Sequence, residues 1–182
     1  CSWPASLTHL ELFVLARPCR VPPMKGPLWP SGGSKIRVLV LRGCFVESLD
    51  DIDWWEGLEE LDMFNSYFNH SIERVTWPPN LRVLRLSWCF NQPVEPVQWP
   101  SHLEVLNFGL ALDRELAGVQ FPPTLQHLSL SYNSIPILLR AMAAHSENAV
   151  VLAGLVAAAA QPFSRFLEAS VVRERRGLTT TP

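Results

Sequence analysis

Residues 77–99 read WPPNLRVLRLSWCFNQPVEPVQW, and variants of this stretch occur several times along the chain. Each copy opens on an aromatic residue, and a Leu-x-x-Leu-x-Leu pattern of apolar residues begins four positions later. The aromatics that align in this way, 22 or 23 residues apart, are Trp54, Trp77, Trp99 and Phe121. A period of about 20 to 29 residues with such a pattern at its centre is typical of solenoids, in which each repeat forms one coil.

A second set of apolar residues supports this interpretation. Nine residues before each aromatic stand Phe45, Phe68, Phe90 and Leu112. Each unit also contains an alternating apolar pair, such as Leu84 and Leu86, which predicts a short β-strand. Prolines between residues 90 and 99 exclude a long helix from the rest of the unit. We therefore expect a coil with a parallel sheet on one side and irregular segments on the other.

The repeats predict how the chain is divided. Six units can be aligned, the second of which is irregular and carries a Ser-Gly-Gly-Ser insertion. We predict a repeat array over residues 1–137, an Ala-rich helical cap or tail over 138–176 and a disordered tail over 177–182.

The composition of the last third of the chain supports the helical prediction. Residues 149–160 are mostly alanine, valine and leucine, and apolar residues from Phe163 to Val171 follow helical spacing. The apolar run is too short to cross a bilayer, so we expect no membrane span. A formal net charge of −2 also argues against a nucleic-acid partner.

Two motifs resemble known repeat families. Residues 125–135 (LQHLSLSYNSI) resemble the leucine-rich repeat consensus. Residues 90–94 (FNQPV) resemble the FNIP repeat, named for Phe-Asn-Ile-Pro, and residues 68–72 (FNHSI) are a less faithful copy. The resemblance implies an α/β repeat fold, a leucine-rich-repeat-like right-handed solenoid with a short parallel β-strand in each coil of 22–23 residues. It also implies a non-catalytic scaffold or adaptor for protein–protein interaction, of the kind sometimes joined to F-box or kinase domains.

The outward positions of the predicted strands contain the candidate site. The second position of the Leu-x-x-Leu-x-Leu pattern is charged in four successive units, and the charges alternate in sign. We expect these residues to pair across strands: Arg37, Glu59, Arg82 and Glu104. Further along each unit, aromatic residues fall on or beside the concave face, which is the outward surface of the predicted sheet. Packing of the core does not require aromatic residues at these positions. They either bind a partner or pack under flanking loops. The residues predicted to bind a protein partner on this face are Phe64, Glu60, Asp62, Arg85, Trp88, Asn107 and Tyr132.

The sequence gives no sign of catalysis, and we expect neither a cofactor nor a metal. His9 and His127 share one column but lie five coils apart, about 24 Å at the spacing of neighbouring strands. No P-loop, G-x-G-x-x-G, H-E-x-x-H or G-x-S-x-G motif is present. The repeated tryptophans recur once per coil, which predicts a structural role for them at the edge of the core.

The cysteines bear on the compartment. Cys44 and Cys89 fall two coils apart, about 10 Å, which is beyond disulfide reach and favours a reducing, intracellular location. The alternative is an extracellular leucine-rich recognition ectodomain of a receptor or secreted protein. That alternative predicts disulfide-capped ends and a glycan on Asn69, which opens an Asn-His-Ser sequon. Because the chain starts at Cys1 without a methionine, we expect it to be part of a longer protein.

Overall fold

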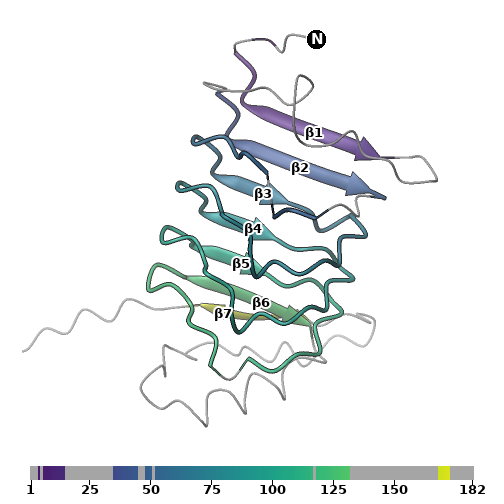
Figure 1. Cartoon of the computed structure of the whole chain (residues 1–182), viewed down its shortest axis with the longest axis vertical. Helices are drawn as coiled ribbons and strands as arrows, with labels where there is room; N and C mark the ends of the chain where they lie inside the picture. The colour runs from purple at the N-terminus through teal and green to yellow at the C-terminus, as the bar shows by residue number, and fades with distance from the viewer. Residues whose placement is uncertain are drawn as a thin grey trace, which may run out of the picture.

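The computed structural model describes residues 4, 6–14, 35–44, 48–50, 52–116, 118–131 and 168–172. Within these residues the protein forms one sheet of seven strands, which follow one another across the sheet in sequence order (Figure 1). The strands are β1 (His9–Val14), β2 (Val38–Gly43), β3 (Glu60–Asp62), β4 (Val83–Arg85), β5 (Val105–Asn107), β6 (His127–Ser131) and β7 (Glu168–Val172). β1 to β6 are parallel, so the predicted parallel sheet built from consecutive repeats is confirmed.

One leucine per strand fixes the register. Leucines at the fourth position of successive units pair directly across the sheet and are almost fully buried. A shift of one residue would turn this column outward, so the leucines specify a single alignment of neighbouring strands. These residues are Leu10, Leu39, Leu61, Leu84, Leu106 and Leu128.

Polar side chains end the short strands. The Oδ1 atom of Asp62, the last residue of β3, accepts the backbone N–H of Phe64 at 2.9 Å. Asn107 ends β5 in the same way and accepts the N–H of Gly109 at 2.7 Å. In each case the side-chain oxygen accepts a backbone N–H that a neighbouring strand would otherwise bond. The chain can therefore turn out of the sheet after only three strand residues.

The two Phe-Asn pairs join neighbouring coils through both the core and the surface. The fully buried rings of Phe68 and Phe90 stack with centroids 6.2 Å apart and an interplanar angle of 2°. The Oδ1 atom of Asn69 accepts the N–H of Asn91 at 2.8 Å, and the Oδ1 atom of Asn91 accepts the N–H of Asp113 at 3.1 Å. Each of these bonds spans 22 residues, so the asparagines hold successive coils at one offset.

The repeated tryptophans line the edge of the core, near the starts of the strands. Trp77 is 8% exposed, and the half-buried Trp99 packs against Phe108 and stacks on Phe121, with centroids 5.8 and 6.3 Å away. The indole N–H groups of Trp54, Trp77 and Trp99 are buried without a hydrogen-bond partner among the described residues. The rings therefore contribute packing, and their indole N–H groups form no hydrogen bond with the part of the chain that the structure describes.

Replacing Trp77 with phenylalanine should consequently cost much less stability than replacing it with alanine. The phenyl ring keeps most of the apolar contact and removes a buried donor that has no partner. Phe121 already fills the equivalent position two coils further on. In urea unfolding we expect Trp77→Ala to lose about 3 to 5 kcal/mol and Trp77→Phe to lose about 1 to 2 kcal/mol. Equal losses for the two variants would show that the indole N–H is needed.

The helical prediction is wrong for residues 168–172. These residues form β7, which pairs antiparallel with β6 so that Ser129 lies opposite Ser170. The free edge of a parallel sheet exposes backbone N–H and C=O groups, and pairing with a strand satisfies them where a helix would not. The other residues of the expected cap at 138–176, the expected disordered tail at 177–182 and Tyr132 lie outside the described residues. No helix occurs among the residues that are described.

Candidate functional site

In β3, β4 and β5, the side chains on either side of the buried leucine point away from the core. Glu60 and Asp62 lie on β3, Arg85 lies on β4 and Asn107 lies on β5. Asp62, Arg85 and Asn107 stand in register on three adjacent strands, and all four side chains are partly exposed. The structure thus brings these four predicted residues together on one face of the sheet.

The charged members of this face form a compact group, here called the Arg85 cluster (Glu60, Asp62 and Arg85). The Nη1 atom of Arg85 donates a hydrogen bond to Oε1 of Glu60 and lies 3.9 Å from Oδ2 of Asp62. A separation of 3.9 Å is too long for a hydrogen bond, so Arg85 is bonded to Glu60 and compensates Asp62 less completely. The single positive charge of Arg85 therefore faces two negative charges, those of Glu60 and Asp62.

Asp62 and Asn107 have a structural role that the sequence did not suggest. Each uses its Oδ1 atom to accept the backbone N–H that begins the next turn. Oδ2 of Asp62 remains directed toward Arg85, so Asp62 serves both the turn and the face. The side-chain carbonyl oxygen of Asn107 already accepts the N–H of Gly109, so it is less available for the predicted contact with a partner.

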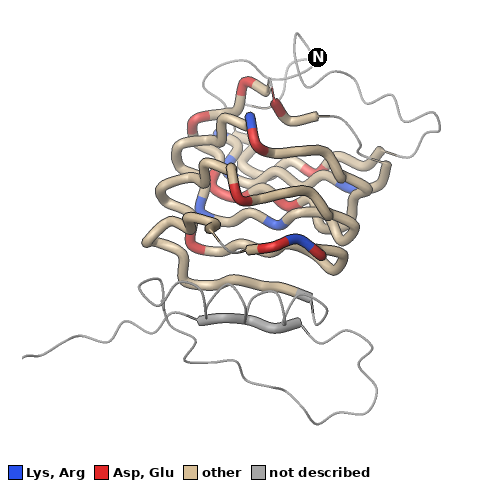
Figure 2. The backbone as a smooth tube through the Cα atoms, turned by 60° about the horizontal axis from the view of Figure 1, so that its bottom comes forward, with Lys and Arg blue, Asp and Glu red and all other residues tan. Residues whose placement is uncertain are grey.

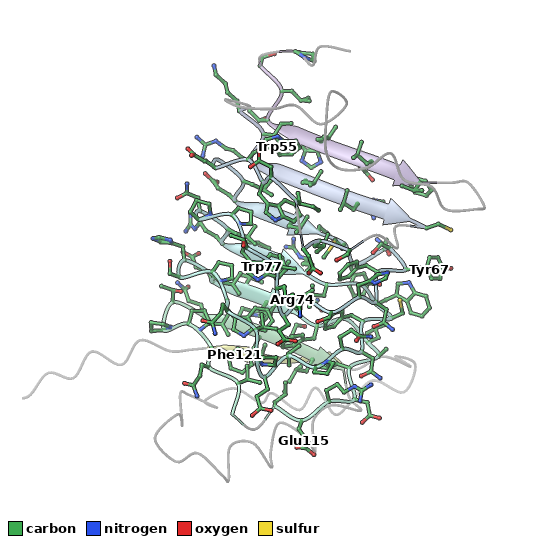
Figure 3. All side chains as sticks on the ribbon, viewed as in Figure 1. Trp55, Tyr67, Arg74, Trp77, Glu115 and Phe121 are labelled. Carbon is green, nitrogen blue, oxygen red and sulfur yellow. The ribbon has the colours of Figure 1, made fainter. Side chains whose placement is uncertain are left out.

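Exposed aromatic residues gather where the strands end. Trp88, which follows β4, is 40% exposed, and its backbone N–H donates to the carbonyl of Phe64 at 3.0 Å. Tyr67, which follows β3, is 53% exposed, and its ring meets that of Trp88 edge to face with centroids 5.5 Å apart. Figure 3 shows Tyr67 projecting beyond the ends of the strands, on the side opposite Trp77 and Phe121. We call Tyr67 and Trp88 the aromatic rim.

Sequence reasoning found one half of this rim and missed the other. Trp88 was predicted, and Phe64, also predicted, is half-buried within the turn that follows β3. Tyr67 falls outside the columns of the repeat in which outward side chains align. The available signal was its place directly before the fully buried Phe68, because neighbouring residues of an extended segment point in opposite directions. The remaining predicted member, Tyr132, lies outside the described residues.

Charged residues at the second position of the repeat pair near the starts of the strands, in two of the three adjacent combinations that were expected. Arg37 is bonded to Glu59, and Arg82 donates to both carboxylate oxygens of Glu104 at 2.7 and 2.9 Å. The hydrogen bond to Glu104, together with that carboxylate's charge, raises the pKa of Arg82 above its ordinary value. Acidic and basic positions are interleaved over the described coils (Figure 2). Such exposed pairs help align neighbouring strands and contribute little to stability.

In the part of the chain that the structure describes, no group of three or more histidine, cysteine, aspartate or glutamate side chains is placed to hold a metal ion. Across the described ranges, no helix has the length and hydropathy needed to cross a membrane.

The order of the strands and the regular offset between coils define a repeat protein in which each coil stacks on the one before it. Residues 68–111 match the family model of the FNIP Repeat, which confirms the predicted resemblance over this segment. This part of the chain therefore consists of FNIP repeats, and it contains both Phe-Asn pairs. Among the curated proteins, none matches the chain.

Proposed function

We propose that this chain is a non-catalytic protein-interaction module that binds a protein partner through the outward face of its parallel sheet and the adjoining aromatic rim. The observation that carries the proposal is the exposure of Tyr67 and Trp88, 53% and 40%, at one end of the strands. Tyrosine and tryptophan are the residues most enriched at binding hot spots. Their position is not required by the core, which is filled by the leucine, phenylalanine and tryptophan columns.

The repeat scaffold supports binding by holding this surface in one conformation. The N–H of Trp88 is bonded to the carbonyl of Phe64, and the N–H of Tyr67 is bonded to the carbonyl of Gly43, so each rim residue is tied to the preceding coil. A surface that is already ordered loses less conformational entropy when a partner binds. We propose further that the coils of 22–23 residues wind as a right-handed, leucine-rich-repeat-like solenoid, which presents the face as a continuous platform.

The non-catalytic part of the proposal is supported by the state of the carboxylates. Glu60 is bonded to Arg85, and Asp62 is bonded to the N–H of Phe64, so neither is arranged as an isolated acid or base. We also propose a reducing, intracellular compartment for this scaffold or adaptor. The described thiols, Cys44 and Cys89, support that location because both are free.

Removing the aromatic rim should abolish most of the binding. We expect the double variant Tyr67→Ala and Trp88→Ala to weaken partner binding by about 100-fold or more, since truncating a hot-spot aromatic costs about 2 kcal/mol and about 1.4 kcal/mol corresponds to a tenfold change in affinity. The partner would be isolated with the wild-type chain, and its dissociation constant would then be measured by isothermal titration calorimetry.

Two controls make this experiment specific. Arg74→Ala removes another exposed side chain, which Figure 3 places well away from Tyr67, and should leave the dissociation constant unchanged. Circular dichroism should show the same spectrum for all variants. Undiminished affinity in a correctly folded double variant would refute the proposed surface.

A further inference from the structure

Over β1 to β4, the outward face of the sheet carries one more negative charge than positive charge. Its charged side chains in β1 to β4 are the three carboxylates of Glu11, Glu60 and Asp62 and the two guanidiniums of Arg42 and Arg85. Glu11 and Arg42 are paired with each other. The excess therefore falls within the Arg85 cluster.

Within that cluster, Asp62 is the carboxylate with the weaker partner. Arg85 bonds Glu60 but stands 3.9 Å from Oδ2 of Asp62, beyond hydrogen-bond distance. The side chains of Glu60 and Asp62 are 31% and 23% exposed, so solvent screens their charge less than it would on an open surface. A second cation placed against Asp62 would gain an attraction that Arg85 does not already satisfy.

The aromatic rim lies within reach of the same carboxylate. A chain of two hydrogen bonds links them, from Asp62 to the N–H of Phe64 and from the carbonyl of Phe64 to the N–H of Trp88. Trp88 follows Arg85 by three residues, so their Cα atoms are at most about 10 Å apart, the length of three residues of extended chain. A flexible basic side chain can span part of this distance and place its charge against an aromatic face, which attracts cations.

From this juxtaposition we infer that the partner presents an arginine- or lysine-bearing segment, whose cationic groups meet Asp62 and the aromatic rim. The inference rests on the proposed function and names the chemistry of the partner. A second copy of this chain is disfavoured, because its outward face has the same excess of negative charge and would be repelled. An acidic segment is disfavoured for the same reason.

Two substitutions change the charge of the cluster in opposite directions. Asp62→Asn removes the weakly compensated charge but keeps the turn, because asparagine already performs this role at Asn107. Arg85→Gln removes the cation that competes with a ligand for Asp62. Both variants leave the aromatic rim in place.

The probe is the blocked pentapeptide Gly-Arg-Gly-Arg-Gly, titrated into the full chain while backbone and indole N–H signals are followed by NMR. The matched control peptide has glutamine in place of arginine. We expect the arginine peptide to shift the signals of residues 60–67 and 85–88 and to bind more tightly than the glutamine peptide. Asp62→Asn should weaken its binding about two- to fivefold, and Arg85→Gln should strengthen it by a similar factor.

The outcomes separate the two claims. The inference is overturned if the two peptides bind equally or if the charge variants leave affinity unchanged. Because Arg85→Gln also removes a partner of Glu60, its folding is checked by urea unfolding, and Asp62→Asn decides the result if Arg85→Gln is unstable. If removal of Tyr67 and Trp88 leaves the natural partner bound, the proposed function itself fails, whatever the peptides show.

Discussion

Replacing Phe90 with alanine is expected to lower the free energy of unfolding by about 3 to 5 kcal/mol. The Phe90 side chain is fully buried and lies parallel to Phe68 of the preceding coil, so its loss opens a cavity between two coils. The surrounding backbone cannot close this cavity, because the asparagine bonds on either side hold the coils at a fixed offset. Urea unfolding followed by circular dichroism measures the loss directly.

The next coil supplies the control for this experiment. Leu112 stands at the position equivalent to Phe90 and is also buried, so Phe90→Leu should be accepted with a loss of only about 1 to 1.5 kcal/mol. The exposed substitution Arg74→Ala should change stability by less than about 0.5 kcal/mol. If Phe90→Ala were no more harmful than Arg74→Ala, Phe90 would not be part of a packed core between the two coils.

Replacing Gly109 with alanine is expected to cost about 2 to 4 kcal/mol. Gly109 has a φ of +75°, and a Cβ atom added to it would lie 2.1 Å from the carbonyl oxygen of Ser87 and 2.9 Å from Cα of Trp88. Both are backbone atoms of the preceding coil, so neither can move aside without separating the coils. Unfolding by urea should therefore begin at a markedly lower concentration in this variant.

A substitution at a second glycine, Gly118, distinguishes the cost of backbone strain from the cost of steric overlap. Gly118 has a φ of +87°, but the atom nearest to its added Cβ is Oε1 of Glu95, at 2.8 Å, which ends a flexible side chain. Gly118→Ala should thus cost only the conformational strain, about 1 to 2 kcal/mol. Equal losses for the two variants would mean that the close approach of coils at Gly109 has no energetic consequence.

The parallel sheet and its register were predictable because both depend on columns of apolar residues. The leucines at the fourth position meet only when the strands align as they do, and each column repeats several times in the sequence. The Phe-Asn pairs were recognisable for a similar reason, since the hydrogen bonds they form have the same 22-residue offset as the repeat.

The aromatic rim and β7 were harder to predict for physical reasons. The contact between Tyr67 and Trp88 depends on the side-chain directions of two different coils, and neither residue type recurs at its position throughout the array. Residues 168–172 follow an alanine-rich region of high helix propensity, yet they pair with β6 because a sheet edge offers unsatisfied backbone groups. The sequence pattern within residues 168–172 does not indicate that they pair with a strand far away in the sequence.

The asparagine bonds also bear on how arrays of this kind change length. Asn91 donates its N–H to Asn69 of the preceding coil and accepts the N–H of Asp113 of the following coil. The same type of hydrogen bond therefore joins this coil to both of its neighbours. Duplication or deletion of a 22-residue block would therefore recreate the bonds at its own junction and leave every other coil unchanged. Whole coils can therefore be added to this fold or removed from it without disturbing their neighbours, whereas an insertion or deletion of a few residues would break the bonds on both sides.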